Sequence, residues 1–421
     1  MSQTFSPRAL ALRVLAPFAA GYFLSFLYRT VNAVLAPHIS REVHLDAGDL
    51  GLMTGMYFLT FGAFQLPLGI LLDRFGPRRV EAALLLFAAA GAFAFSLADG
   101  AGTLIFGRAL VGLGVSACLM AALKANVQFF PALKLPLMNG VVLSAGGLGA
   151  VAATAPVQAA LAFTDWRGIY VGIAALTVMV AAILFLAVPD RHSTAAQSGG
   201  LRDQLRDVAG IFRDRGFRHV MPIGMLAMGS FLAIQGLWAG PWLRDVAGLN
   251  PDGVALGLTT MAASMTAGFL LMGVIADRMA RLHVPVVVVG GVGMVVFWLA
   301  QSAMALGWVG APLVLCALFG FFGSSSSLMY AVVTQLFPAH LAGRATTSIN
   351  LTMFLAAFLL QWGLGAIIGW WPKGEAGWPP EAYTLAFGIP SVLMAAALLW
   401  FIPAARTAGK AEPHRISNPP Q

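Results

Sequence analysis

Charged residues are scarce in this chain of 421 residues. Asp, Glu, Lys and Arg together make up 10% of it, whereas hydrophobic residues make up 59%. Soluble domains carry roughly 25% charged residues, so a soluble fold of this composition would expose too much apolar surface to water. Apolar runs of about 20 residues recur along the chain, and each is long enough to cross a bilayer as a helix. The composition therefore indicates a multi-span membrane protein.

Residues that carry enzyme chemistry or bind metals are also sparse. The two cysteines, Cys118 and Cys316, both lie in apolar runs, so we expect small buried side chains and no disulfide or metal site. The sequence contains no P-loop, nucleophile elbow or metal-ligand cluster. We therefore expect no enzyme activity and no cofactor. We attribute the net charge of +8 to the positive-inside bias of membrane proteins, not to nucleic-acid binding, and expect a monomer in the bilayer.

Twelve apolar runs define the expected membrane spans. They are residues 12–37, 50–72, 81–98, 103–129, 137–161, 169–188, 219–243, 254–275, 284–304, 309–333, 346–369 and 383–402. The first run is too long for the apolar region of a signal peptide, so we expect it to be retained. A polar stretch with an amphipathic helical pattern separates the first six runs from the last six. We expect four parts: an N-terminal bundle (1–188), a cytoplasmic linker (189–218), a C-terminal bundle (219–402) and a disordered cytoplasmic tail (403–421).

The distribution of Lys and Arg predicts the orientation. If the N-terminus is inside, 18 of the 25 basic residues fall in cytoplasmic segments. The outside loops then hold Arg41, Arg167, Arg244 and Lys373. This asymmetry predicts that both termini are cytoplasmic. The three remaining basic residues lie within expected spans and are Arg29, Arg108 and Lys124.

Two loops, one half-chain apart, share a pattern. GILLDRFGPRR (69–79) follows the second run, and GVIADRMARLH (273–283) follows the eighth. The first resembles the signature loop of the major facilitator superfamily, G-x-x-x-D-[RK]-x-G-[RK]-[RK], and GRALVGLGVSA in the fourth run resembles the R-x-x-x-G-x-G pattern of that family. The resemblance implies an all-α membrane fold with twelve transmembrane helices in two six-helix bundles, each an inverted 3+3 repeat, in a bacterial inner membrane.

The same resemblance implies transport by alternating access, with the two loops as a cytoplasmic gate. Glycines permit close helix approach, and Asp73 and Asp277 can pair with arginines across the halves in one state and release them in the other. The expected gating or conformational residues are Gly69, Asp73, Arg74, Gly76, Arg78, Arg79, Arg108, Gly273, Asp277 and Arg278. The alternative is that these charges only anchor the topology. For Arg108, helix packing or coupling is favoured over solute binding.

The positions of the acidic residues indicate the charge of the solute. We expect all seventeen Asp and Glu residues to lie in loops, at span ends or in the tail, which leaves Arg29 and Lys124 without an acidic partner at their own depth. A charge within a span costs a few kcal/mol, so an anionic solute is expected to neutralise these residues. The guanidinium of Arg29 suits a carboxylate, nitrate or phosphate. The stretch YRTVN also resembles the Y-x-x-R-x-N pattern of organic-anion members of the superfamily, although its tyrosine is adjacent to the arginine. For both residues the alternative is snorkelling to an interface.

Uncharged polar residues complete the expected site. The predicted solute-binding residues are Arg29, Asn32, Lys124, Gln235, Trp238 and Tyr330. Each uncharged member has an alternative as an interhelical hydrogen-bonding group. Because no carboxylate is expected inside the membrane, the sequence leaves three energy sources for transport open. A proton could travel on the solute, groups near Asp245 could titrate, or one anion could be exchanged for another.

Two other functions compete with anion transport. One is export of lipophilic drugs or metabolites. The other is copper import, because thioethers suit Cu(I) and M-x-x-x-M places two sulfurs on one helix face. The methionines in question are Met221, Met225, Met261 and Met265.

Overall fold

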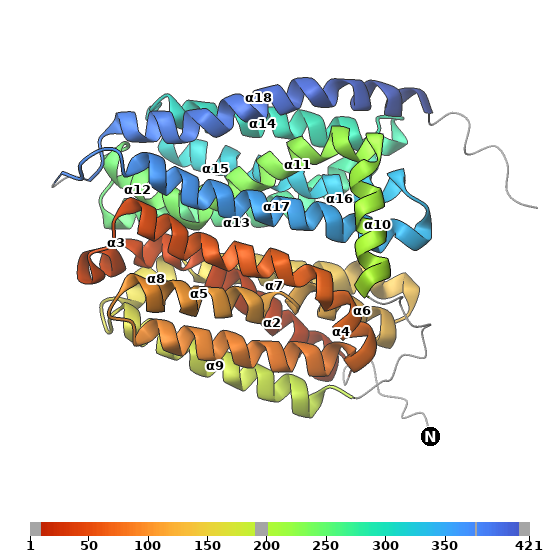
Figure 1. The fold of residues 1–421 in the computed structure, drawn as a ribbon, viewed down its shortest axis with the longest axis horizontal. Coiled ribbons are helices and arrows are strands. Elements are labelled where there is room, and N and C mark those ends of the chain that lie inside the picture. The colour runs from red at the N-terminus through yellow and green to blue at the C-terminus, as the bar shows by residue number, and fades with distance from the viewer. Residues whose placement is uncertain (1–9, 190–200, 375–376, 412–421) are drawn as a thin grey trace, which may run out of the picture.

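The computed structural model describes residues 10–189, 201–374 and 377–411, and these residues form helices joined by short turns. Figure 1 shows two halves stacked on each other, the first in red to yellow and the second in green to blue, with their helices along one common axis. Helix α10 (Leu201–Arg213) lies at one end of the stack, which we call the linker end. The opposite end is called the far end. The positive-inside rule predicts that the linker end is cytoplasmic.

The first half contains eight α-helices and two short irregular ones. Their bounds are η1 (Ala11–Leu15), α2 (Ala16–Thr30), α3 (Asn32–Val43), α4 (Ala47–Ser96), α5 (Ala101–Val115), α6 (Cys118–Phe129), η2 (Ala132–Lys134), α7 (Leu135–Ala152), α8 (Ala155–Ala160) and α9 (Trp166–Ala187). After α10, the second half consists of α11 (Arg215–Ala233), η3 (Ile234–Trp238), α12 (Ala239–Asp245), α13 (Pro251–Arg281), α14 (Val286–Ala305), α15 (Pro312–Gly323), η4 (Ser324–Ser327), α16 (Leu328–Leu336), α17 (Ala339–Ile368) and α18 (Pro380–Ala411).

These helices account for the twelve expected spans. Within the described residues, nine helices are long and apolar enough to cross a membrane, and the bent pair α2–α3 adds a tenth. Helix α4 has 50 residues and is interrupted at Gly76, whose φ of 78° and ψ of 159° are non-helical, so it supplies two spans. The shorter α7, continued by α8, completes the set. A positive φ favours glycine, which explains Gly76 in the loop between the second and third spans. The expected tail begins at 403, and α18 continues beyond it to Ala411.

The first, fourth, seventh and tenth spans are all broken near their middle. α2 and α3 meet at a bend of 46°, and α5 and α6 are separated by Ser116 and Ala117. A π-helix, η3, interrupts the seventh span, and a 3₁₀-helix, η4, interrupts the tenth. A further break separates α7 from α8 in the fifth span. Four of the five breaks thus fall in the first helix of each three-helix repeat, and irregular backbone in transporters marks helices that line the central cavity.

The two halves contact each other toward the far end. A Cβ atom added to Gly240 of α12 would lie 2.7 Å from the carbonyl oxygen of Ala33 in α3. The hydroxyls of Thr154 and Thr259 share a hydrogen bond of 2.9 Å between the fifth and eighth spans. Helices α4 and α17 run side by side along the boundary (Figure 1). At Gly140, Gly273 and Gly343, toward the linker end, an added Cβ atom would have no heavy atom within 4 Å.

Two glycines of α7 test how the first half is packed. A Cβ atom on Gly149 would lie 2.1 Å from the carbonyl oxygen of Phe23, whereas one on Gly140 meets no atom within 4 Å. Overpacking costs roughly 1–3 kcal/mol, whereas Gly→Ala in an open helix position gains up to about 1 kcal/mol. We expect Gly149→Ala to lower the melting temperature of the purified protein and Gly140→Ala to leave it unchanged or raise it. Equal melting temperatures for the two variants would contradict the close contact of α7 with α2.

Candidate functional site

Arg29 lies one residue before the end of α2, where the two halves meet. Its side chain is 8% exposed, and aromatic rings surround the guanidinium. The Cζ atom lies 4.4 Å from the ring centroid of Phe26, 5.5 Å from those of Phe61 and Phe354, and 6.0 Å from that of Tyr57. Phe354 belongs to α17 of the second half, and the other three rings belong to the first. We call these four rings the aromatic cage.

The cage leaves the charge of Arg29 only partly compensated. Among the described residues, no acidic side chain forms an ion pair with Arg29, and its Nε atom has no hydrogen-bond partner. A cation–π contact contributes about 0.5–2 kcal/mol, whereas desolvation of an ion costs several kcal/mol. The expectation that Arg29 has no acidic partner therefore holds for the described chain. The rings keep water away from the guanidinium, which strengthens its attraction for an anion.

Arg108 positions the segment that carries Arg29. It is fully buried in α5, its Nη1 donates to the carbonyl oxygen of Tyr28 at 2.9 Å, and its Cζ lies 5.1 Å from the ring centroid of Tyr57. Arg108 thus contacts both the residue preceding Arg29 and one ring of the aromatic cage. These contacts agree with a packing role, which the sequence favoured over solute binding.

Asn32 is held within the first half. Its amide Nδ2 donates to Thr54 Oγ1 at 3.2 Å, and its Oδ1 accepts a hydrogen bond of 2.5 Å from Tyr170. The bend between α2 and α3 separates it from Arg29, although the two residues are three apart in sequence. The structure therefore places Asn32 in an interhelical network of α3, α4 and α9.

Lys124 requires a correction. The sequence led us to expect no acidic partner for it, but its Nζ forms an ion pair with Asp73 of the signature loop. The side chains are 22% and 48% exposed, so the pair contributes at most about 1 kcal/mol. The expectation failed because Asp73 was placed in a loop and Lys124 in a span, whereas α6 and this part of α4 meet at the same depth near the linker end.

The predicted residues of the second half lie on its broken spans. Gln235 and Trp238 both belong to the π-helix η3 and are buried. Gln235 Nε2 donates to the sulfur of Met265 at 3.5 Å, and Trp238 Nε1 donates to the carbonyl oxygen of Gln361 at 3.2 Å. These contacts hold both residues within their own half.

Tyr330 is brought close to Arg29. It lies on α16, donates a hydrogen bond to Asn350 of α17, and is near enough to Arg29 and Tyr22 to interact with them electrostatically. Arg29 and Tyr330, 301 positions apart in sequence, therefore lie on opposite halves of one central region. Of the six predicted binding residues, these two are the ones placed across the boundary from each other.

Glu81 is an acidic residue that the sequence analysis places at a span end and that the structure buries completely. It lies in α4, five residues after Gly76, and its side chain is 0% exposed. Neither carboxylate oxygen is bonded to a nitrogen or another oxygen, and the thiol of Cys118 is the neighbouring donor. A Cβ atom added to Gly21 of α2 would lie 2.0 Å from Glu81 Oε1 and 3.9 Å from the sulfur of Cys118. The carboxyl is thus buried where α2, α4 and α6 meet, and Gly21 provides the space for it.

Among the described residues, Asp73 and Asp277 of the expected gate form ion pairs within their own halves. Asp73 is bound to Lys124 of its own half, and Asp277 pairs at 2.9 Å with Arg281 one turn further along α13. Arg74 lies 5.2 Å from the ring of Phe75. Arg78 lies 4.9 Å from the ring of Phe185, and Arg79 also interacts with another residue. The remaining members Gly69, Gly273 and Arg278 are exposed. This arrangement fits a conformation that is open at the linker end.

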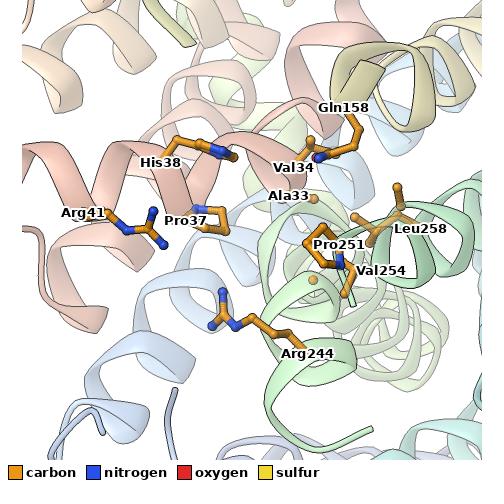
Figure 2. Close-up of a pocket in the computed structure, with 12 residues that line it drawn as sticks. Ala33, Val34, Pro37, His38, Arg41, Gln158, Arg244, Pro251, Val254 and Leu258 are labelled. Carbon is orange, nitrogen blue, oxygen red and sulfur yellow. The ribbon is translucent and has the colours of Figure 1, made fainter. Parts of the chain in front are cut away.

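A pocket lies between the halves at the far end. Its volume is about 300 Å³, and it is formed by α3 and α8 of the first half and by α12 and α13 of the second. Figure 2 shows three basic side chains around it, His38, Arg41 and Arg244, with Gln158 on the opposite side. None of these residues was predicted as a site residue. The signal was available, because Arg41 and Arg244 are two of the four basic residues expected outside.

The architecture is that of a membrane transporter, with two six-helix bundles and broken helices at their interface. The sequence model of the Major Facilitator Superfamily matches residues 18–360, and the chain belongs to this family. It is therefore a multi-pass membrane protein and a secondary transporter, and not an enzyme.

Several proteins resemble this chain. It is 24% identical over 294 residues to the probable sulfoacetate transporter SauU of Cupriavidus necator, covering 67% of each chain. It is 25% identical over 269 residues to the nitrite extrusion protein of Bacillus subtilis, covering 63% of this chain and 65% of that one. A shorter match, 33% over 167 residues, is to the efflux pump hmp6 of Hypomyces subiculosus and covers 39% of this chain and 29% of that one.

Two solved structures show the same fold. The nucleoside transporter NupG superposes with a TM-score of 0.74 at 13% identity, covering 92% of this chain and 98% of that one. A bacterial homologue of the lysosomal transporter Spinster, in an inward-facing and occupied conformation, superposes with a TM-score of 0.69 at 18% identity, covering 94% and 95%. The expectation of an all-helical, multi-span membrane fold of this superfamily is thereby confirmed.

Proposed function

We propose that this transporter carries a small organic anion and that Arg29 binds its charged group. The observation that supports this most is a buried guanidinium, enclosed by four rings and without an ion pair in the described chain. A carboxylate or sulfonate fits the planar fork of arginine with two parallel hydrogen bonds. The names of two relatives, which mention sulfoacetate and nitrite, agree with an anionic solute.

The position of Arg29 explains how binding would drive a conformational change. Its cage includes Phe354 of the second half, and Tyr330 lies across the boundary from it. A ligand shifts an equilibrium only through contacts that differ between the two states. An anion held between α2 and α16–α17 makes such contacts, because both halves touch it in one state and separate in another.

The remaining predicted residues take supporting roles in this proposal. Lys124 lies nearer the linker end than Arg29 on the broken fourth span, and its exchange between Asp73 and an arriving anion would link solute binding to the signature loop. Gln235 and Trp238, on the seventh span, shape the wall of the central solute site. We further propose that the linker end faces the cytoplasm of a bacterial inner membrane, because the excess of basic residues lies there.

Glu81 provides a coupling proton in this proposal. A buried carboxyl whose neighbouring donor is only the weak thiol of Cys118 is penalised in its charged form, which makes it suited to bind a proton. Cys118 is hydrogen-bonded to this carboxyl and interacts electrostatically with Arg29. When an anion neutralises Arg29, the positive potential at Glu81 falls and proton uptake becomes more favourable. Anion and proton would therefore bind with positive coupling.

A ligand screen tests the anion proposal. A ligand that binds only the native state raises the melting temperature in proportion to RT ln(1 + [L]/Kd). The purified protein is heated at constant ionic strength with small carboxylates, sulfoacetate, nitrite, Cu(I) and the lipophilic cation tetraphenylphosphonium. We expect one class of anion to stabilise the protein. Stabilisation by the lipophilic cation alone would favour drug export, a function with which the aromatic cage and the match to hmp6 are compatible. Stabilisation by Cu(I) alone would favour copper import.

A further inference from the structure

The floor of the far-end pocket is the contact between the two halves. Ala33 and Gly240 touch there, and the buried side chain of Leu258 lies beside them. Arg41 lines the pocket from the first half, and Arg244 lines it from the second half (Figure 2). Any motion that separates α3 from α12 therefore also separates the two guanidinium groups and removes the pocket.

The pocket carries a net positive charge, because Arg244 forms an ion pair with Asp245 whereas Arg41 forms none with the described residues. None of its twelve lining residues is acidic. Arg41 is exposed and has no hydrogen bond or ion pair to the described residues. The adjacent Glu42 is turned away, because its carboxylate accepts hydrogen bonds from Trp166 at 2.6 Å and from Arg167 at 2.8 Å. Arg41 is therefore available to a ligand.

One nitrogen of the Arg244 guanidinium is hydrogen-bonded, and its two terminal nitrogens are available to a ligand. Its Nε donates to Asp245 Oδ1 at 2.6 Å, and the other carboxylate oxygen of Asp245 accepts from the Trp378 amide and from Tyr383. Asp245 is thus used to hold the loop before α18. The cationic surroundings also act on Lys373: burial and, after it, the charge of Arg244 keep the pKa of Lys373 below its usual value.

We propose that this pocket is a second anion-binding site, in which one small oxyanion contacts both Arg41 and Arg244. The chemical class is a sulfate, a free phosphate or the phosphate group of a lipid, since arginine forks bind all three through the same oxygen geometry. A volume of about 300 Å³ accommodates such a group together with several waters. No residue of the pocket belongs to the central site, so the inference holds for any solute carried at Arg29.

The bound anion would act as a clamp on the far end. It joins two cations that belong to different halves and otherwise repel each other. It therefore binds the conformation that is closed at the far end more tightly than the conformation that is open there, and it shifts the population toward the closed one. The site therefore regulates the transport cycle through its preference for the conformation that is closed at the far end.

Sodium sulfate is the probe for the first experiment, added at constant ionic strength to the protein in nanodiscs of neutral lipid. We expect sulfate to raise the melting temperature of the wild type, of Arg29→Gln and of the control Arg215→Gln, which removes an exposed arginine near the linker end. Arg41→Gln should lose at least 10-fold in apparent sulfate affinity. An unchanged response of Arg41→Gln would overturn the proposal, and so would loss of the response in Arg29→Gln, which would place the sulfate in the central site.

Two further experiments identify the source of the bound anion and its effect on the conformation. Nanodiscs containing anionic lipid distinguish a headgroup from a free ion: if the lipid itself stabilises the wild type but not Arg41→Gln, the headgroup occupies the same site. Spin labels at the exposed positions Phe163 and Leu306, which lie in far-end loops of the two halves, report the separation of the halves. Sulfate should increase the population with the shorter distance in the wild type and leave Arg41→Gln unchanged. A wild-type distribution that does not respond to sulfate would contradict the clamp.

Discussion

Replacement of Arg29 by glutamine is expected to weaken anion binding by about 100-fold or more. Loss of one charged partner from a buried pair costs roughly 2–5 kcal/mol, and each 1.4 kcal/mol corresponds to a factor of ten in affinity. Glutamine is neutral and presents no guanidinium fork to an anion. Isothermal calorimetry with the anion identified by the melting-temperature screen measures the loss directly.

Two controls separate this effect from a change in folding. Arg29→Lys keeps the charge without the planar fork, so we expect it to retain part of the affinity. Arg215→Gln removes a positive charge at an exposed position outside the aromatic cage and should bind as the wild type does. If Arg29→Gln bound the anion with unchanged affinity, the guanidinium would be only a packing element held by the four rings.

Replacement of Glu81 by glutamine is expected to abolish accumulation driven by a pH gradient and to leave exchange intact. Glutamine resembles the protonated carboxyl in shape and in lacking charge, so the variant can bind the anion and change conformation but has no proton to release. In proteoliposomes, uptake against a concentration gradient should fall to the level of empty vesicles. Counterflow, in which labelled anion outside exchanges for unlabelled anion inside, should continue.

The control for this variant is Glu381→Gln, which removes an exposed carboxylate at the start of α18. Infrared difference spectra between acidic and alkaline pH give a readout that needs no solute: the C=O component of a carboxyl in a dry environment should be present in the wild type and in Glu381→Gln and lost in Glu81→Gln, while the bands of exposed carboxyls remain. If Glu81→Gln accumulated the anion as strongly as the wild type, Glu81 would be a structural carboxyl and the coupling would lie elsewhere. Loss of both accumulation and counterflow would indicate a defect in binding or folding.

The spans were predictable because they depend on local properties of the chain. A run of apolar residues long enough for the bilayer forms a helix wherever it occurs, since the backbone has no other partner there. The sequence analysis named Gly76 only as part of the signature loop, and its positive φ explains why a glycine stands there. The lack of an ion pair for Arg29 among the described residues also followed from sequence, since no acidic residue lies in the middle of its span or of the neighbouring expected spans.

Lys124 and Glu81 were misjudged because depth along a helix does not determine which side chains meet. Glu81 lies near the start of an apolar run and was assigned to its end, yet it points at Gly21 on a span 60 residues earlier. The aromatic cage was also missed. Phenylalanine and tyrosine are common in every span, and only the packing of α2, α4 and α17 distinguishes Phe26, Phe61 and Phe354 from the rest.

Counterflow of labelled small carboxylates, sulfoacetate and nitrite into proteoliposomes tests the central claim most directly, because it requires binding at the site and movement of both halves and does not require a driving gradient. The account predicts that at least one anion is exchanged by the wild type, and that Arg29→Gln reduces this exchange by about 100-fold when the labelled anion is supplied well below the wild-type Kd. Exchange of a lipophilic cation with no exchange of any anion, or equal exchange by the wild type and Arg29→Gln, would contradict it.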